Sequence, residues 1–361
     1  MSVFSIKIGD EWVSHSSLLA VTKNKITNDF ERKALTFCQS WLTDKQVFEF
    51  NTSGSTGTPK KISFKREQLI ASAHLTAKAL ELTSGSTSLV CLDTEFIAGA
   101  MMLVRGMVVG MNMIIKPPSA NPLENITEQI DFTALVPYQV IHLLEHPPEK
   151  LNSISKVIIG GAPLNQETIG LLQSLTPAFY ATYGMTETIT HIAIQKLNGS
   201  DRQDYFQLLP GIEVSIDDRS CLSIRASHLG NDPIITNDIV SLITKDKFQW
   251  IGRYDRVINS GGVKVSPEKI EKIVESAFAE LKIKSRFFVE SLQDQKLGQQ
   301  VALVIEGEPL AGDILKNIND LLKGALEKYE MPRQVLFVSR FAETASQKID
   351  RLATLKLLVT R

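Results

Sequence analysis

Apolar strands that alternate with helical stretches between Ser88 and Gly184 constrain the fold of this chain more than any other feature. The hydrophobic pattern predicts strands at residues 88–92, 113–115, 132–136, 156–159 and 178–183, and helices at residues 99–109, 123–129, 138–145 and 166–175. Several of these strands are almost continuously apolar, which is typical of strands that are covered on both faces. The alternation therefore predicts an α/β domain with a mostly parallel sheet, in which ligands bind beyond the carboxyl ends of the strands.

The pattern changes from about Gly211 onward, where short strands at residues 213–216, 221–225, 239–243 and 248–251 predict a small β subdomain. A further unit begins after Gly252, with a helix introduced by Ser266-Pro267 and a second helix near residues 313–328. Strands are expected at residues 286–289, 301–305 and 334–338. We place the boundary at Asp255, which gives a large domain at 1–254 and a small α+β domain at 255–361.

Composition limits the partners that this chain can have. A hydrophobic content of 43% is typical of a globular protein, and 39 basic against 40 acidic residues give no support for nucleic-acid binding. Cys38, Cys91 and Cys221 are far apart, so they suggest neither a disulfide framework nor a zinc site. We interpret them as buried thiols in a reducing compartment, and the N-terminus lacks the pattern of a signal peptide. Both features favour the cytoplasm.

One stretch, residues 97–115, is apolar and about long enough to cross a bilayer. It contains Arg105 and Asn112, however, and Gly106 and Gly110 divide it. A buried helix followed by a buried strand fits this pattern better, so we expect no membrane span.

A loop rich in hydroxyls and glycine, Thr52-Ser53-Gly54-Ser55-Thr56-Gly57-Thr58-Pro59-Lys60, follows the extended apolar residues 47–50. Glycine lets a backbone approach a ligand closely, hydroxyls and turned N–H groups donate to phosphate oxygens, and lysine adds a positive charge. The spacing does not fit the common nucleotide-binding pattern G-x-x-x-x-G-K-[ST], because Pro59 stands where that pattern requires its second glycine. The alternative interpretation is an ordinary Ser/Thr/Gly-rich surface loop.

The loop resembles the T-S-G-S-T-G-x-P-K signature of the adenylate-forming superfamily, which includes acyl-CoA synthetases and luciferases, and every position agrees. The resemblance implies an N-terminal domain that binds ATP and an acid, and a mobile C-terminal domain that acts as a lid. It also implies ATP, Mg²⁺ and coenzyme A as reactants. The loop would hold the ATP phosphates through Thr52, Ser53, Gly54, Ser55, Thr56, Gly57 and Lys60.

A second match follows the strand predicted at residues 178–183. The segment Tyr183-Gly184-Met185-Thr186-Glu187 is similar to the family's Y-G-x-T-E signature, although by itself it could equally be a helix start with Thr186 as the cap. The resemblance implies that Glu187 binds Mg²⁺, that Thr186 contacts a phosphate, and that Tyr183 lies beside adenine. Upstream, Gly160 and Gly161 resemble the turn that lines the adenine site.

Further matches lie toward the C-terminus. Asp238 resembles the family's ribose-binding aspartate, although a turn aspartate is the common alternative. The segment that begins Gly252-Arg253-Tyr254-Asp255 resembles the family's hinge, which implies that Arg253 contacts the ribose or α-phosphate and that Asp255 is the pivot. Gly261 and Gly262 would border the channel for coenzyme A.

The terminal element contains Lys348, which matches the family's catalytic lysine for adenylation, although Gln347 stands where glycine is usual. Family members also carry a longer segment ahead of the phosphate loop, so we expect part of the usual N-terminal subdomain to be missing. These two departures leave open a non-catalytic protein that binds acyl nucleotides.

The acid pocket is expected around Phe96, Arg105 and Thr190. An arginine within an apolar helix is costly unless it is paired, so Arg105 either pairs with an internal carboxylate, reaches the surface, or grips a second carboxylate on the substrate. His191 is more often a satisfied core histidine than a catalytic one. The surroundings of Arg105 resemble the o-succinylbenzoate–CoA ligases of menaquinone biosynthesis, which implies an aromatic dicarboxylic acid as substrate. Another aryl or acyl acid–CoA ligase, or an enzyme that loads a carrier protein, remains an alternative, and a homo-oligomer is possible.

Overall fold

The computed structural model describes residues 2–22, 26–51, 61–343 and 349–359. The chain divides into two compact units. The first comprises Met1–Val214, Ile224–Ile234 and Leu242–Phe248, and the second comprises Ser215–Ser223, Ile235–Ser241 and Gln249–Arg361. The β region predicted after Gly211 therefore contributes to both units, and the boundary at Asp255 remains a prediction.

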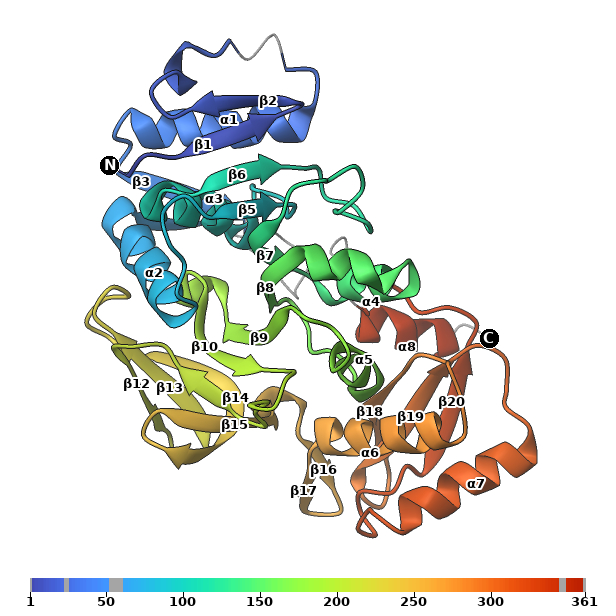
Figure 1. The fold of residues 1–361 in the computed structure, drawn as a ribbon. Coiled ribbons are helices and arrows are strands. Elements are labelled where there is room, and N and C mark those ends of the chain that lie inside the picture. The colour runs from blue at the N-terminus through green and yellow to red at the C-terminus, as the bar shows by residue number, and fades with distance from the viewer. Residues whose placement is uncertain (1, 23–25, 52–60, 344–348, 360–361) are drawn as a thin grey trace. The chain divides into compact units, whose positions relative to one another are not determined.

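The first unit is built on a large mixed sheet (Figure 1). Strands β9, β8, β7, β5, β6 and β1 lie next to one another in that order and are parallel, whereas β2 and β10 pair antiparallel at the two ends of this set. The strands are β1 (Ser5–Ile8), β2 (Glu11–Ser14), β5 (Thr87–Val90), β6 (Asn112–Ile115), β7 (Ile130–Leu135), β8 (Ile154–Ile159), β9 (Ala178–Gly184), β10 (His191–Lys196) and β11 (Phe206–Leu208). The predicted parallel sheet is confirmed.

Helices cover both faces of the parallel strands, as the continuous apolar runs predict. Alternate strand residues such as Leu89, Val157 and Ile159 pack in one cluster with helices α4 (Pro137–Glu145) and α5 (Gln166–Leu172). Helix α3 (Ile97–Val109) packs against β5, β6 and β7 and is almost entirely buried. A Cβ atom at Gly106 would lie 2.1 Å from the sulfur of Met113 on β6, so glycine permits the close approach of helix and strand. Residues 97–115 are thus a buried helix and a buried strand, as predicted.

Other elements of the first unit are α1 (Asp29–Leu42), the hairpin of β3 (Val47–Asn51) and β4 (Lys61–Lys65), and α2 (Arg66–Ala79). Four strands follow β11 and neighbour one another in chain order: β12 (Ile212–Ile216), β13 (Cys221–Ala226), β14 (Ile234–Thr244) and β15 (Lys247–Arg253). All four agree with the predicted short strands. Cys38, Cys91 and Cys221 are buried free thiols, again as predicted.

The helix predicted at residues 123–129 is wrong, because this segment forms turns. The side chain of Asn121 accepts a hydrogen bond from the Leu123 N–H, and Asn125 adopts a positive φ of 57°. Asparagine competes with helix formation in both ways, since it bonds nearby backbone and tolerates the left-handed region.

The second unit contains a five-stranded sheet with the order β17-β16-β19-β18, and β20 also pairs with β19. Its elements are β16 (Ile258–Ser260), β17 (Val263–Val265), α6 (Pro267–Glu280), β18 (Phe287–Asp294), β19 (Gly298–Glu306), α7 (Gly312–Lys323), β20 (Gln334–Val338) and α8 (Arg351–Val359). One core cluster joins α6 and α7 to the sheet, and another joins residues of α8 to Phe288 and Val304. The α+β character predicted for this part of the chain is confirmed.

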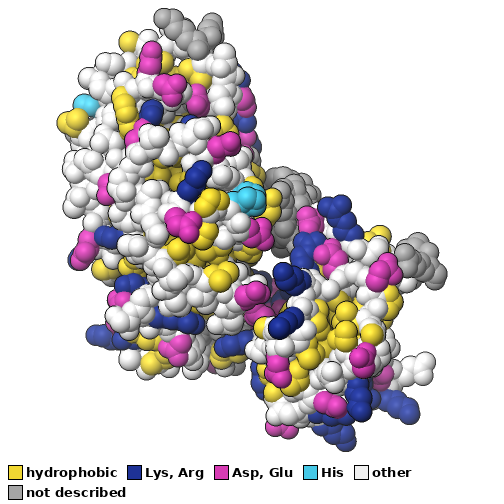
Figure 2. Space-filling model, turned by 45° about the vertical axis from the view of Figure 1, so that its right-hand side comes forward, with side chains coloured by type: hydrophobic (Ala, Val, Ile, Leu, Met, Phe, Trp, Pro, Cys, Tyr) yellow, Lys and Arg dark blue, Asp and Glu magenta, His cyan; other side chains and the backbone are white. Residues whose placement is uncertain are grey.

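Acidic and basic side chains lie interspersed on the face of the molecule shown in Figure 2. Within the described ranges, every helix is too short or too polar to traverse a lipid bilayer.

Candidate active site

The predicted phosphate loop, Thr52, Ser53, Gly54, Ser55, Thr56, Gly57, Thr58, Pro59 and Lys60, lies outside the described residues. Its two flanks are described. Asn51 at the end of β3 pairs with Lys61 at the start of β4, so the two residues that flank the loop lie side by side. The Asn51 N–H also donates to the carbonyl of Glu95, 3.3 Å away, and Asn51 bridges to Phe96. This contact places Asn51 next to the N-terminus of α3.

Predicted nucleotide residues gather at the carboxyl ends of neighbouring strands. Gly160 and Gly161 follow β8 directly, and Tyr183 and Gly184 end β9, which is parallel to β8. A Cβ atom at Gly184 would lie 2.4 Å from the carbonyl oxygen of Thr190, so only glycine lets the chain pass here. The two glycine turns therefore lie at one edge of the sheet, where ligands bind in open α/β sheets.

The Tyr183–Glu187 segment folds as a strand end followed by one 3₁₀ turn, Thr186–Thr188, and not as the start of an α-helix. The Tyr183 ring is buried against Phe206 and Phe248, with ring centroids 5.7 Å and 5.1 Å away. Glu187 is exposed and Thr186 is half-buried. A carboxylate beside a hydroxyl is a set of hard oxygen donors that fits Mg²⁺.

The residue that follows this turn is strained. Ile189 has φ 67° and ψ −58°, and the Thr190 N–H donates to the carbonyl of Thr188 at 2.7 Å. These values define a γ-turn with positive φ, which is rare and costly for a β-branched residue. Strained backbone of this kind is concentrated at functional sites. Here the γ-turn sets the direction of Thr190. No local sequence signal reveals this turn.

Arg105 lies on α3 and is only 2% exposed. Its Nη2 donates to Thr190 Oγ1 at 2.9 Å, and its Nη1 makes a weak contact of 3.8 Å with the sulfur of Met102. Its Nε has no partner, and no carboxylate of the described residues lies within ion-pair distance. Of the three roles weighed for Arg105, the structure excludes exposure to solvent and gives no sign of an internal ion pair in the part of the chain it describes.

Burial lowers the pKa of Arg105 from 12.5 to about 9, because the charged form loses its hydration. The guanidinium is therefore still charged near neutral pH but is poorly stabilised. An anionic group next to it would restore much of the lost interaction. Thr190 and Arg105, which were predicted to share the acid pocket, are in direct contact, whereas Phe96 is 39% exposed at the N-terminal end of α3.

A chain of hydrogen bonds leads away from Arg105. Thr190 Oγ1 lies 3.1 Å from His191 Nδ1, and Thr76 Oγ1 on α2 lies 3.2 Å from His191 Nε2. Because Thr190 accepts from Arg105, its hydroxyl is free to donate to Nδ1, which leaves the proton of a neutral imidazole on Nε2. Burial and the charge of Arg105 hold the pKa of His191 well below its usual value of 6.5. The interpretation of His191 as a core histidine is confirmed. Thr76 completes this chain of hydrogen bonds, and the sequence did not reveal it.

In the second unit, Asp238 lies within β14 and is 7% exposed, so the turn-aspartate alternative is wrong. Its Oδ1 accepts from the indole N–H of Trp250 at 3.1 Å and lies 3.7 Å from Nη1 of Arg253. Arg253 also donates in a fork to Asp255, at 2.9 Å and 2.7 Å. The structure thus brings together the predicted ribose aspartate, the predicted phosphate arginine and the predicted pivot, and this fork lowers the pKa of Asp255.

Gly261 and Gly262 form the turn of the β16–β17 hairpin, both with positive φ, 61° and 85°. A Cβ atom at Gly261 would lie 2.9 Å from the ring of Tyr329, whereas one at Gly262 would meet nothing within 4 Å. Gly261 is therefore sterically required, and Gly262 faces open space. Lys348, the predicted adenylation residue, lies outside the described residues.

The sequence profile of the AMP-binding enzyme family matches residues 27–225. Among solved structures, the chain is 37% identical to an AMP-forming acyl-CoA synthetase/AMP-acid ligase II-like protein from Dyadobacter fermentans, with a TM-score of 0.65 over 95% of this chain and 98% of that one. The o-succinylbenzoate CoA synthetase of Bacillus subtilis, in complex with its acyl-adenylate intermediate, has a TM-score of 0.72 at 21% identity. It covers 84% of this chain and 68% of that one, and at this identity it shows the fold alone.

Curated relatives include the 2-succinylbenzoate–CoA ligase of Salmonella typhimurium, which is 24% identical over 338 residues, 90% of this chain and 71% of that protein. A 4-chlorobenzoate–CoA ligase from Arthrobacter is also 24% identical, over 84% of this chain and 65% of that protein.

Proposed function

We propose, since this chain belongs to the AMP-binding enzyme family, that it is an AMP-forming acid–CoA ligase whose acid is o-succinylbenzoate. Its relatives support the class of reaction, and several of them are named as ligases for this acid. The activity would belong to menaquinone biosynthesis and, we expect, to the cytoplasm.

The observation that carries the choice of acid is the buried charge of Arg105. A guanidinium that is 2% exposed, and whose hydrogen-bond partners among the described residues are a threonine hydroxyl and a thioether, is a costly feature of a folded protein. A substrate with one carboxylate for the chemistry and a second carboxylate for Arg105 would supply the missing counter-charge. A simple benzoate has no second carboxylate, so it would leave the guanidinium without a counter-charge.

The hydrogen-bond chain supports the same role. Thr190 holds Nη2, while the orphaned Nε and the weakly held Nη1 leave donors for a carboxylate. His191 is kept neutral and fixes the Thr190 hydroxyl, which is itself aimed by the γ-turn at Ile189. His191 and Thr76 are positioning residues, since they act on the substrate only through Thr190 and Arg105.

In the first half reaction, a carboxylate oxygen of the acid attacks the α-phosphorus of ATP, the bond to the β-phosphate breaks, and pyrophosphate leaves. We assign phosphate binding to residues 52–60, ribose binding to Asp238 and Arg253, and adenine contacts to Gly160, Gly161 and Tyr183. Glu187 would hold Mg²⁺, which neutralises phosphate charge when bound, and Thr186 would contact a phosphate. Lys348 would stabilise the negative charge that develops at the α-phosphate.

In the second half reaction, the sulfur of coenzyme A attacks the acyl carbon and AMP leaves with the electron pair. We assign the rotation between the two half reactions to Asp255, and the channel for the thiol to the Gly261–Gly262 turn. Replacement of Gly262 by tryptophan should then slow thioester formation from preformed adenylate and spare adenylate formation.

Pyrophosphate release with o-succinylbenzoate, benzoate and 4-chlorobenzoate tests this proposal. Arg105→Lys should raise KM for o-succinylbenzoate, because lysine lacks the planar fork, and should change the monocarboxylates little. Arg66→Lys is the matched control, since Arg66 is a buried arginine of the same unit that has protein partners in Trp41 and Asp44. Equal effects of Arg105→Lys on all acids would make Arg105 structural and would favour an aryl monocarboxylate, the class to which 4-chlorobenzoate belongs.

A further inference from the structure

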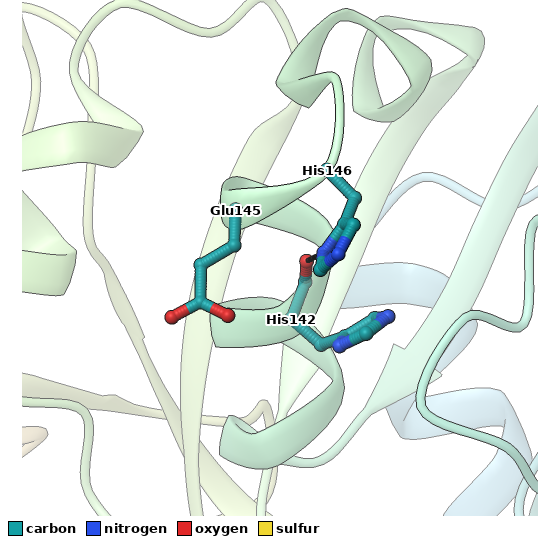
Figure 3. Close-up of side chains that lie close together, drawn as sticks. All are labelled: His142, Glu145 and His146. Carbon is teal, nitrogen blue, oxygen red and sulfur yellow. Dashed lines mark hydrogen bonds between the residues drawn. The ribbon is translucent and has the colours of Figure 1, made fainter.

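A cluster of metal-ligating side chains lies at the end of helix α4, apart from the residues assigned to ATP and the acid. His142 and Glu145 belong to the last turn of α4, and His146 is the residue that caps its C-terminus, so the three side chains surround the end of this helix (Figure 3). One donor atom from each lies within 4.8 Å of the others. Glu145 and His146 are exposed, and His142 is half-buried.

The hydrogen bonding of His146 favours metal binding. Its Nδ1 lies 3.0 Å from the carbonyl oxygen of His142, as the dashed line in Figure 3 shows. A carbonyl can only accept, so Nδ1 carries the proton and Nε2 presents its lone pair. Histidines that bind metals almost always donate the other ring nitrogen to a carbonyl or carboxylate in this way, which fixes both the tautomer and the ring.

The local charge is also suitable for a cation. The last carbonyls of α4 carry the partial negative charge of the helix C-terminus, and Glu145 adds a carboxylate. The His142 and His146 rings are stacked with centroids 4.2 Å apart, so both imidazoles already lie together. Around an ion with bonds of about 2.0–2.1 Å, ligand atoms are about 3.3 Å apart. Rotation of the exposed Glu145 side chain can bring its carboxylate closer to the two imidazoles.

We propose that His142, Glu145 and His146 bind a divalent transition metal ion, best represented by Zn²⁺, with water in the remaining position. Two imidazoles and one carboxylate are the donor set of many zinc sites, whereas Mg²⁺ prefers oxygen ligands only. The ion cross-links the last turn of α4 and stabilises the folded chain by an amount that grows with the logarithm of the free Zn²⁺ concentration above Kd. It does not take part in adenylate formation.

The test is a titration of the full-length chain, free of any histidine tag, with Zn²⁺ against a chelating indicator. We expect one ion per chain, a rise in Tm with Zn²⁺, and affinity losses of at least about 10-fold in His142→Ala and in His146→Ala. His74→Ala is the matched control, because His74 is an exposed histidine on helix α2 outside the cluster, and it should bind as wild type does. Co²⁺ should give the visible absorption of a four-coordinate site in wild type and lose it in both variants.

Two results would overturn the proposal. One is the absence of Zn²⁺ binding to the wild-type chain at an excess of Zn²⁺ over protein. The other is unchanged affinity and stoichiometry in the His142→Ala/His146→Ala double variant, which would place any bound ion elsewhere.

Discussion

Two arginines of this protein, Arg105 in the first unit and Arg256 in the second, differ in their electrostatic surroundings. Arg256 donates to Glu268 at 2.6 Å and to Glu271 at 3.1 Å, and Arg351 joins it by donating to Glu271 at 3.0 Å. Arg105 is more deeply buried and has no carboxylate within ion-pair distance among the described residues. The compensated charge belongs to the scaffold, whereas the uncompensated one has a use only when a ligand completes it. Each experiment below changes one side of this contrast.

The largest effect is expected from Arg105→Met on catalysis. Loss of one partner of a desolvated, hydrogen-bonded charge pair costs about 2–5 kcal/mol, which corresponds to a drop of roughly 30-fold to several-thousand-fold in kcat/KM. The drop should appear with o-succinylbenzoate and be small with benzoate. An equal drop in kcat/KM for both acids, measured by pyrophosphate release, would contradict this difference between the two arginines. Arg105 would then support the fold, as Arg256 does.

Next in size is Glu271→Gln, which removes the negative charge that Arg256 and Arg351 share at Glu271 Oε1. Burial raises the pKa of Glu271 to about 7, so the carboxylate is fully charged only above about pH 8. Removal of one partner from a fully buried ion pair costs about 3–5 kcal/mol, and because the Glu271 side chain is 22% exposed we expect a loss nearer 2–3 kcal/mol in the free energy of unfolding above that pH. Urea denaturation measures it. A loss below about 0.5 kcal/mol would mean that this network resembles an ordinary surface pair.

The same Arg105→Met variant should be more stable than wild type without substrate, by about 1–2 kcal/mol, because methionine needs no counter-charge. The sign with pH follows from the pKa of Arg105, which is lowered to about 9. Between about 9 and 12.5 the unfolded chain binds more protons than the folded one, so stability of the wild type rises with pH. The advantage of Arg105→Met is therefore complete at pH 7 and should shrink above pH 9. A less stable variant would show that Arg105 is already compensated.

A smaller effect, on stability below neutral pH, is expected from His191. Its pKa is well below 6.5 in the folded protein, so below pH 6.5 the unfolded chain takes up a proton that the folded chain does not. Stability therefore falls as pH decreases, by about 1 kcal/mol near pH 5.5 from this group. His191→Gln should flatten the fall between pH 6.5 and 5.5, measured as Tm. His74→Gln, an exposed control, should leave it unchanged.

The smallest effect is expected at the fork of Arg253 and Asp255. The fork lowers the pKa of Asp255, so its contribution is present above the unfolded pKa near 3.8 and is lost as pH falls through the folded value. Because both side chains are more than 40% exposed, Asp255→Asn should cost less than about 1 kcal/mol at pH 7. A larger stability loss by urea denaturation would make this fork a structural pair and not a hinge contact.

Sequence reasoning located most strands of the large sheet within a few residues, because continuous apolar runs such as those at β7 and β8 have few other ways to be buried. It failed at residues 123–129, where the turn chemistry of Asn121 and Asn125 prevailed over helical periodicity. It also passed over β10, β11 and α8, whose patterns are short or lack helical periodicity. The site motifs were found by their residue types, but Thr76 and the γ-turn at Ile189 were not, since neither has a local signature.

The residues at the carboxyl ends of β8 and β9 were determined by the sequence alone, because glycines are required where backbones turn or pass closely and the parallel direction of the strands follows from the alternation of strands and helices. The environment of Arg105 was decided only by the tertiary structure. Among the described residues its one strong partner, Thr190, is separated from it by 85 positions, and the absence of a nearby carboxylate in that part of the chain depends on everything packed around α3. A sequence shows that a charge will be buried, but only the three-dimensional packing decides which groups surround it, because pairing depends on distance in space and not on distance along the chain.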